Sequence, residues 1–174
     1  LGVMGTGSIG RHIAKTAAAF GLQVHGFSRS GAGVNEFDRV YPAGQLEDFL
    51  AGVDYIVGVL PDTPATIGLL DDRAFSVMKR GAYLVNVGRG TLIDDAALVR
   101  AVNDGKLAGA ALDVFQAEPL PEDSILWHTP GVLITAHVAA KSIPREIARI
   151  FRENYRRYIR GQPLMYRIDF ERGY

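Results

Sequence analysis

The sequence has 174 residues, a length that suits one ordinary domain with a sizeable core, and 48% of them are hydrophobic against 22% charged. Lysine plus arginine and aspartate plus glutamate both total 19, so bulk charge gives no support to binding of nucleic acid or of an anionic membrane. The chain has no cysteine, which excludes disulfides and thiolate metal sites, and no apolar run of 18 residues that would predict a transmembrane helix.

Short apolar runs alternate with helical patterns along the chain, which predicts βαβ units and a parallel sheet covered on both faces. The expected strands are residues 1–4, 23–28, 39–41, 54–60, 83–87, 108–113 and 132–135. The expected helices are residues 9–20, 45–50, 72–78, 95–103 and 143–160. Asp71, Asp94 and Ser142 each precede one of these helices and are placed to act as N-caps.

The first and last expected helices have apolar stripes at helical spacing. In the first helix, Ile13, Ala17 and Phe20 are spaced to face the sheet. In the last helix, arginines surround a stripe made of Ile147, Ile150, Phe151, Tyr155, Tyr158 and Ile159. Amphipathic helices of this kind usually bury the stripe, so we expect it to contact the core and the basic face to be solvated.

The first loop of the chain, residues 5–10, reads Gly-Thr-Gly-Ser-Ile-Gly and matches the G-x-G-x-x-G pattern without a mismatch. In this pattern the first glycine permits a tight turn, the second allows close approach of a pyrophosphate, and the third allows close packing of helix and strand. The start of the following helix offers unpaired N–H groups and a positive dipole end to the phosphates.

A glycine-rich turn without a ligand is the alternative interpretation of this loop. The strand before it, the helix after it and a second strand about 20 residues later favour a dinucleotide site. We therefore predict an α/β fold with a doubly wound parallel sheet, a Rossmann-type dinucleotide-binding domain. Residues 1–160 would form this domain, and residues 161–174 a C-terminal tail.

The end of the second expected strand bears on the choice of cofactor. An NAD-selective site usually has a carboxylate here, but this chain reads Phe27-Ser28-Arg29-Ser30 and has no carboxylate before Glu36. Arg29 can pair with a phosphate or stack on adenine, and the two serine hydroxyls can donate to phosphate oxygens. The pattern favours NADP, although NAD stays possible, and an exposed arginine in a surface turn is the alternative.

Polar side chains follow three further expected strands. Arg89 lies in "NVGRG", Asp113 and Glu118 lie in "LDVFQAEPLP", and His137 lies in "ITAHVAA". The carboxyl ends of the strands are where open α/β sheets place ligands. Taken alone, these residues could be a surface arginine, loop acids and a capped histidine. Together they predict a reaction centre in which Arg89 binds the carboxylate of a substrate.

The sequence resembles the D-isomer-specific 2-hydroxyacid dehydrogenases, and in particular their glyoxylate/hydroxypyruvate reductase branch. The matching stretches are "GTGSIG", "AAAFGLQV", "VLPDTPAT", "GAYLVNVGRGTLIDDAALVRAV", "GAALDVFQAEPLP", "LWHTPGVLITAHVAA" and the ending "IDFERGY". Two features depart from the family. Ala136 stands where a proline usually precedes the histidine, and the family's N-terminal substrate domain is not in this sequence, so we expect a cofactor domain separated from its enzyme.

The resemblance implies roles for particular residues. Arg89 would bind the substrate's carboxylate and keto oxygen, His137 would be the acid/base, and Glu118 would be the partner of His137. Asp113 would stand near the nicotinamide end of the cofactor. The cofactor-binding residues would be Gly5, Thr6, Gly7, Ser8, Ile9, Gly10, Ser28, Arg29, Ser30, Leu60, Pro61, Thr63, Val87, Gly88, Arg89, Asp113, His137 and Ala139.

The predicted activity is hydride transfer between NAD(P)H and a small 2-keto or 2-hydroxy acid, such as glyoxylate or hydroxypyruvate. We expect a cytoplasmic homodimer that pairs through the cofactor domain, no metal, and no nucleic-acid or membrane partner. Leu126 and Trp127 could contribute to the dimer interface, with core packing as the alternative role for each. A nucleotide-sensing, corepressor-like binding module of the same fold is one alternative function. A structural Rossmann domain without a ligand is another.

Overall fold

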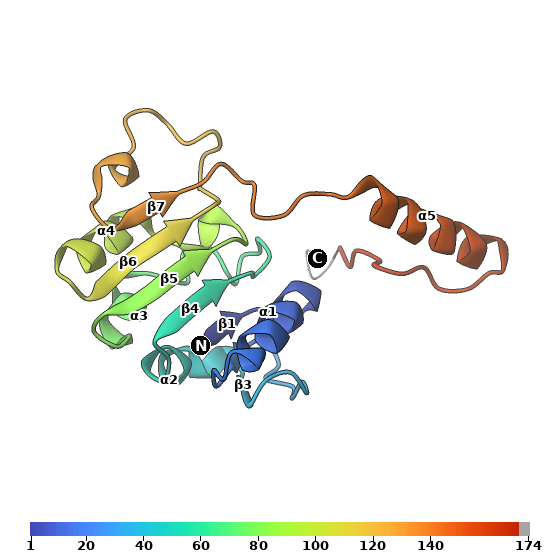
Figure 1. The fold of residues 1–174 in the computed structure, drawn as a ribbon, viewed down its shortest axis with the longest axis horizontal. Helices are drawn as coiled ribbons and strands as arrows, with labels where there is room; N and C mark the ends of the chain where they lie inside the picture. The colour runs from blue at the N-terminus through green and yellow to red at the C-terminus, as the bar shows by residue number, and fades with distance from the viewer. Residues whose placement is uncertain (171–174) are drawn as a thin grey trace. The chain divides into compact units, whose positions relative to one another are not determined.

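The structure is a computed structural model that describes residues 1–170, and it divides into two units, Leu1–His137 and Val138–Tyr174 (Figure 1). Residues 171–174 lie outside the described part. They are the last four residues of the Asp-Phe-Glu-Arg-Gly-Tyr ending and of the expected C-terminal tail. None of the helices in residues 1–170 combines the length and the apolar character that crossing a bilayer would require.

The first unit is built on a seven-stranded sheet with the order β3-β2-β1-β4-β5-β6-β7, in which every neighbouring pair is parallel. The strands are β1 Gly2–Met4, β2 His25–Phe27, β3 Arg39–Tyr41, β4 Tyr55–Gly58, β5 Ala82–Asn86, β6 Leu107–Leu112 and β7 Val132–Ile134. All seven expected strands are present. The structure ends β4 at Gly58, earlier than expected, because the strand beside it, β1, ends at the paired residue Met4.

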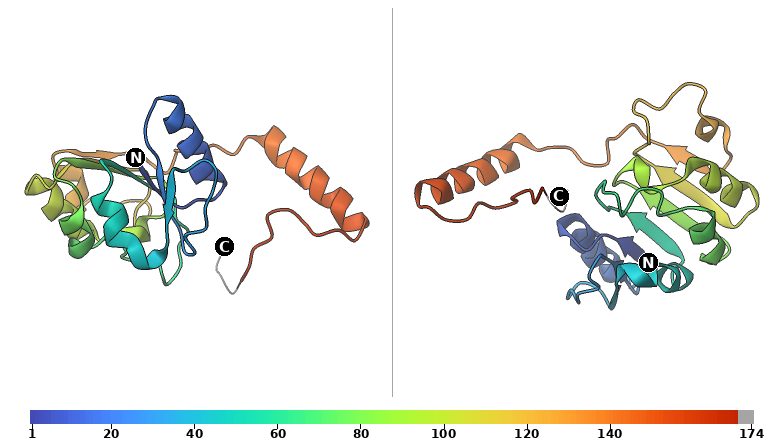
Figure 2. Two further views of the ribbon diagram at one scale, coloured as in Figure 1. Left: turned by 90° about the horizontal axis from the view of Figure 1, so that it is seen from below. Right: turned by 180° about the vertical axis from the view of Figure 1, so that it is seen from behind.

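Helices cover both faces of this sheet. They are α1 Ser8–Ala19, α2 Leu46–Ala51, α3 Asp72–Val77 and α4 Asp95–Asn103, with 3-10 turns η1 Ala43–Gln45, η2 Gly90–Leu92 and η3 Ile125–His128. Ala14 and Ala17 of α1 pack with Val3 and Val24 on one face, whereas the helices α2, α3 and α4 bury a larger cluster on the other. Figure 2 shows α1 on the opposite side of the sheet from these three helices. The predicted doubly wound α/β fold is confirmed.

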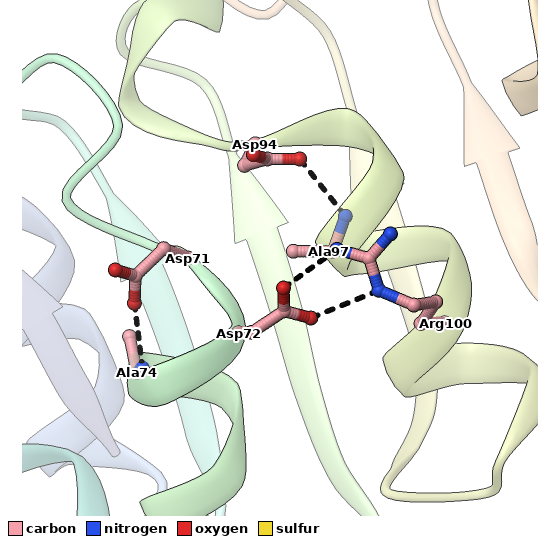
Figure 3. Close-up of polar contacts among 6 residues, drawn as sticks. All are labelled: Asp71, Asp72, Ala74, Asp94, Ala97 and Arg100. Carbon is pink, nitrogen blue, oxygen red and sulfur yellow. Dashed lines mark hydrogen bonds and ion pairs between the residues drawn. The ribbon is translucent and has the colours of Figure 1, made fainter.

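Two of the three predicted N-caps are confirmed (Figure 3). The side chain of Asp71 accepts a hydrogen bond from the Ala74 amide at 2.9 Å, and that of Asp94 accepts one from the Ala97 amide at 2.9 Å. The prediction for Ser142 is wrong. Helix α5 (Pro144–Ile159) has Ile143 as its N-cap and Pro144 in its first turn. The fixed φ of Pro144 suits the first position of a helix, so α5 starts one residue later than expected and the N-cap position moves from Ser142 to Ile143.

The face of α1 differs from its prediction at one position. Ala17 is buried and Ile13 packs partly against the core, as expected, but Phe20 is 83% exposed. The helix ends at Ala19, so Phe20 is the C-cap residue and no longer follows the helical spacing that would direct it towards the sheet. Ala14 and Gly10 are buried in its place.

The second unit, which begins at Val138, contains helix α5 with the segments before and after it. The side chain of Asn154 donates to the Met165 carbonyl at 3.2 Å and accepts from the Met165 amide at 2.8 Å, which holds the following segment beside the helix. None of the residues of α5 is buried, and Phe151 and Tyr158 are more than 70% exposed. The α5 stripe is thus not buried within its own unit, and its expected contact with the core stays a prediction.

Candidate active site

The glycine loop joins β1 to α1, and its three glycines have different reasons to lack a side chain. Gly5 has a φ of +117°, in the region that favours glycine, and its amide donates to the Phe27 carbonyl at the end of β2. A Cβ on Gly10 would lie 1.8 Å from the Gly5 carbonyl oxygen. A Cβ on Gly7, in contrast, would meet nothing within 4 Å in the described part of the chain apart from its own chain neighbours. The protein itself therefore requires Gly5 and Gly10 but not Gly7.

Gly7 is also the N-cap of α1. The helix has no side-chain cap and no acidic residue in its first turn, so the positive end of its dipole carries no compensating charge. Space beside Gly7 and an uncompensated helix start are what a pyrophosphate requires. The predicted contact residues Thr6, Ser8 and Ile9 lie on the same loop and first turn.

The turn after β2 places Ser28, Arg29 and Ser30 next to the glycine loop, since the Gly5 amide bonds to the end of β2. Ser28 Oγ accepts from the Gly31 amide at 3.2 Å, and Ser30 Oγ accepts from the Ala32 amide at 3.2 Å. The turn thus orients both hydroxyl groups while leaving their O–H hydrogens able to donate. Arg29 is exposed at its tip.

The loop after β4 contributes Leu60, Pro61 and Thr63. Leu60 and Thr63 are both 9% exposed, and Thr63 Oγ1 lies 3.0 Å from Thr66 Oγ1, which donates to the Pro61 carbonyl at 2.7 Å. A Cβ on Gly88 would lie 2.9 Å from the Cα of Val59, so this loop packs directly on the turn that carries Arg89.

The Arg89 turn is fixed from inside by Asn86, which is completely buried. Asn86 Nδ2 donates to the Arg89 carbonyl at 2.9 Å, and Asn86 Oδ1 accepts from the Gly88 amide at 3.1 Å. Val87 is half-buried, whereas Arg89 is exposed and its Nη1 donates to the Gly88 carbonyl at 2.7 Å. The guanidinium is thereby held at the carboxyl end of β5.

Close backbone packing sets the Arg89 turn against the loop that carries Glu118. A Cβ on Gly90 would lie 1.9 Å from the Phe115 carbonyl carbon, so only glycine fits there. The Phe115 amide in turn donates to Glu118 Oε1 at 3.0 Å. Arg89 and Glu118 thus belong to two loops whose backbones are in direct contact.

His137 and Glu118 form a pair. His137 Nδ1 lies 2.7 Å from Glu118 Oε2, with side chains 54% and 36% exposed. The hydrogen bond from His137, followed by that from the Phe115 amide, holds the pKa of Glu118 below its ordinary value, and the nearby charge of Arg89 acts in the same direction. A carboxylate in this state stabilises a positive charge on the imidazole, so the pair is suited to proton transfer.

Asp113 links the ends of three strands. It is buried, its amide donates to the Asn86 carbonyl at 3.0 Å, and its carbonyl accepts from the His137 amide at 2.8 Å. Asp113 thereby connects the carboxyl end of β5 to the turn after β7. Ala139 belongs to the second unit, so its place in the cofactor site stays a prediction.

The structure adds residues that the sequence patterns did not single out. Asn86 fixes the Arg89 turn, the Phe115 amide fixes Glu118, and the Thr135 hydroxyl donates to Asp113. The only available signal was their position within the "NVGRG", "LDVFQAEPLP" and "ITAHVAA" motifs. In residues 1–170, histidine, aspartate and glutamate nowhere form a group of three able to hold a metal ion.

Comparison with protein families gives one match over most of the chain. Residues 1–139 match the family model described as D-isomer specific 2-hydroxyacid dehydrogenase, NAD binding domain. Among curated proteins, the whole chain aligns with glyoxylate/hydroxypyruvate reductase A of Photorhabdus laumondii at 38% identity. The chain covers 56% of that protein, so it spans about half the length of the curated relatives it matches.

Solved structures agree with this assignment. A D-isomer specific 2-hydroxyacid dehydrogenase from Xanthobacter autotrophicus, in complex with NADPH and MES, superposes with a TM-score of 0.94 at 40% identity. The match covers all of this chain and 72% of that one. An NADPH-dependent glyoxylate/hydroxypyruvate reductase from Sinorhizobium meliloti, in complex with NADP and sulfate, gives a TM-score of 0.92 at 36% identity, covering 99% of this chain and 56% of that one.

Proposed function

We propose that this chain, which belongs to the D-isomer specific 2-hydroxyacid dehydrogenase family, is the cofactor domain of a reductase that transfers hydride from NADPH to a small 2-keto acid. Glyoxylate and hydroxypyruvate are the substrates we propose, because curated and structural relatives carry those names. The whole protein's reaction, in either direction, interconverts the 2-keto acid and the corresponding 2-hydroxy acid.

The single observation that carries the cofactor proposal is the space at Gly7. Apart from its own chain neighbours, no atom of residues 1–170 lies within 4 Å of a Cβ built there, although the flanking Gly5 and Gly10 are tightly constrained. A pyrophosphate at this loop would explain the missing side chain, and the uncompensated start of α1 supplies the electrostatic attraction.

We propose NADP rather than NAD as the preferred cofactor because of the turn after β2. Its exposed Arg29 offers a cation where an NAD-selective site has a carboxylate, and the ordered hydroxyls of Ser28 and Ser30 can donate to a 2′-phosphate. Relatives solved with NADPH or NADP support this preference. Fluorescence titration of the chain with NADPH and with NADH tests it, and tighter binding of NADH would contradict it.

The chemistry divides among three side chains. The reduced nicotinamide, when bound, supplies the hydride to the carbonyl carbon of the substrate. Arg89 binds the substrate carboxylate and stabilises the negative charge that develops on the keto oxygen. His137 donates a proton to that oxygen, and Glu118, 2.7 Å from Nδ1, stabilises the imidazolium that must be present beforehand.

The pairing of His137 with Glu118 is the observation that carries the proposed reaction. A binding module that only senses nucleotide has no need of a paired acid and base. The test is the decay of absorbance at 340 nm when the whole protein is mixed with NADPH and glyoxylate or hydroxypyruvate. If NADPH binds but neither keto acid accelerates its oxidation, the sensing function takes the place of the enzymatic one.

We further propose a cytoplasmic homodimer that pairs through this domain. Ile125 and Trp127 of η3 and Leu133 of β7 are 49–63% exposed, and η3 contacts β7, so apolar side chains gather there. Leu126, in contrast, is 1% exposed and belongs to the core, so it is not an interface residue. Light scattering that detects only monomers at high micromolar concentration would contradict the dimer.

A further inference from the structure

The turn that carries His137 is held by Asp113 on both sides of Ala136. On one side, Thr135 Oγ1 donates to Asp113 Oδ1 at 2.5 Å, and on the other, the His137 amide donates to the Asp113 carbonyl at 2.8 Å. Asp113 itself is 4% exposed and is fixed through its amide, which donates to the Asn86 carbonyl. The turn is therefore tied to a buried residue at the carboxyl end of β6.

His137 needs such a restraint because its backbone is in an unfavourable conformation. Its φ is +52°, in the left-handed region that residues with a side chain rarely adopt. Conformations of this kind persist only where the surroundings enforce them. The preceding residue is alanine, which does not restrict the backbone as a proline would. The restraint must therefore come from hydrogen bonds on either side of Ala136.

We propose that Thr135 is a positioning residue, whose hydroxyl holds Asp113 so that the turn presents the His137 imidazole to Glu118. The role in catalysis rests on the proposed function, but the pairing of His137 with Glu118 does not. Thr135 itself touches neither imidazole nor Glu118 and acts through Asp113.

Loss of the Thr135 hydroxyl has a definite consequence for Glu118. A buried oxygen of Asp113 loses a donor, which disfavours the native turn, and the contact between His137 Nδ1 and Glu118 Oε2 becomes less populated. That contact is the main reason the pKa of Glu118 lies below its ordinary value. Of the other two groups that act on Glu118, the Phe115 amide still donates and Arg89 keeps its charge. The pKa should thus rise part of the way.

The test is a carbon-13 NMR titration of the Glu118 carboxyl group in the full 174-residue chain, with the signal assigned by its loss in Glu118→Gln. Thr135→Val removes the hydroxyl and should move the pKa of Glu118 upwards, towards its ordinary value of 4.5. Thr135→Ser restores the hydroxyl and should titrate like the parent. Thr129→Val is the control, because it removes a threonine hydroxyl that likewise donates a hydrogen bond, in this case to the backbone carbonyl of Ile125, away from the turn. Thr129 is buried whereas Thr135 is exposed, so Thr129→Val is the more severe test of a general effect on the fold.

An unchanged Glu118 titration in Thr135→Val would overturn the proposal, and so would an equal shift in Thr129→Val. If Thr135→Val does not fold, Thr135→Ala is titrated in its place with the same two outcomes. In the whole protein, kcat for keto-acid reduction should fall about tenfold to a hundredfold in Thr135→Val, with recovery in Thr135→Ser. If the titration shifts as expected but the parent protein reduces no keto acid, the positioning role stands and the proposed function fails.

Discussion

Replacing Gly7 with alanine should separate cofactor binding from folding. Gly7 has φ −75° and ψ −165°, extended values that alanine adopts without strain, and a Cβ there meets no atom of the described residues within 4 Å apart from its own chain neighbours. Alanine is a poorer N-cap than glycine, but it also reduces the entropy of the unfolded chain, so the free energy of unfolding should change by less than about 1 kcal/mol. The added methyl group would occupy the space proposed for the pyrophosphate, and NADPH should bind at least about tenfold more weakly, a loss of ~1.4 kcal/mol.

Gly10→Ala is the matched control, with the opposite pattern. Its Cβ would lie 1.8 Å from the Gly5 carbonyl oxygen, so the loop and the first turn of α1 must move apart. Overpacking of this kind typically costs about 1–3 kcal/mol. The assays are urea denaturation for stability and NADPH fluorescence titration for binding. Parental NADPH affinity in Gly7→Ala, or parental stability in Gly10→Ala, would refute the reasoning about this loop.

Three further predictions follow from the site and from α4. Arg29→Ala should weaken NADPH binding by about tenfold to a hundredfold, because one charge-assisted hydrogen bond worth ~1.5–3 kcal/mol is lost, and should change NADH binding much less. Fluorescence titration with each cofactor measures both affinities, and equal losses would mean that Arg29 does not contact the 2′-phosphate. In steady-state assays of the whole protein, His137→Ala should lower kcat by about 10²–10⁴-fold with cofactor affinity nearly intact, whereas Arg89→Ala should impair both KM and kcat. A parental kcat in His137→Ala would show that His137 is not the acid in the reaction. Burial, and then the neighbouring Asp94, raise the pKa of Asp95 above its ordinary value of 3.8, so this group favours folding most below that value and the benefit is lost as the pH rises through the folded pKa. Asp95→Asn should therefore gain stability relative to the parent as the pH rises through that range in urea denaturation, and a constant difference would contradict the assignment.

The fold was largely predictable because local and global signals agree in this chain. The same doubly wound sheet is indicated by the glycine loop, by the alternating apolar runs and by the aspartates before two helices. The structure confirms the strands and the caps at Asp71 and Asp94. Ser142 was mispredicted because the helix was expected to begin at residue 143, whereas α5 begins at Pro144 and the N-cap position therefore falls on Ile143. Phe20 was mispredicted because the helical period was extended one residue past the end of α1.

The sequence indicated which side chains belong to the candidate site, but not which residues hold them in place. Arg89, Glu118 and His137 stand out as polar residues after apolar strands. The structure places His137 in contact with Glu118, and the catalytic roles of all three residues stay predictions. Asn86 and Thr135 do not stand out, since a polar residue at a strand end is equally compatible with solvent exposure. The role of Asn86 depends on the geometry of its own turn, where it bonds Gly88 and Arg89, and that of Thr135 on a hydrogen bond to Asp113 at the end of another strand. A single sequence specifies neither.

The most direct test of the account follows the hydride itself. The whole protein is mixed with glyoxylate and NADPH that carries deuterium at both C4 positions of the nicotinamide, and the product is analysed by mass spectrometry. The account predicts a 2-hydroxy acid with one deuterium on the former carbonyl carbon for each NADPH consumed. A product without deuterium, or bound NADPH that is never consumed in the presence of glyoxylate or hydroxypyruvate, would contradict hydride transfer to a keto acid at this site.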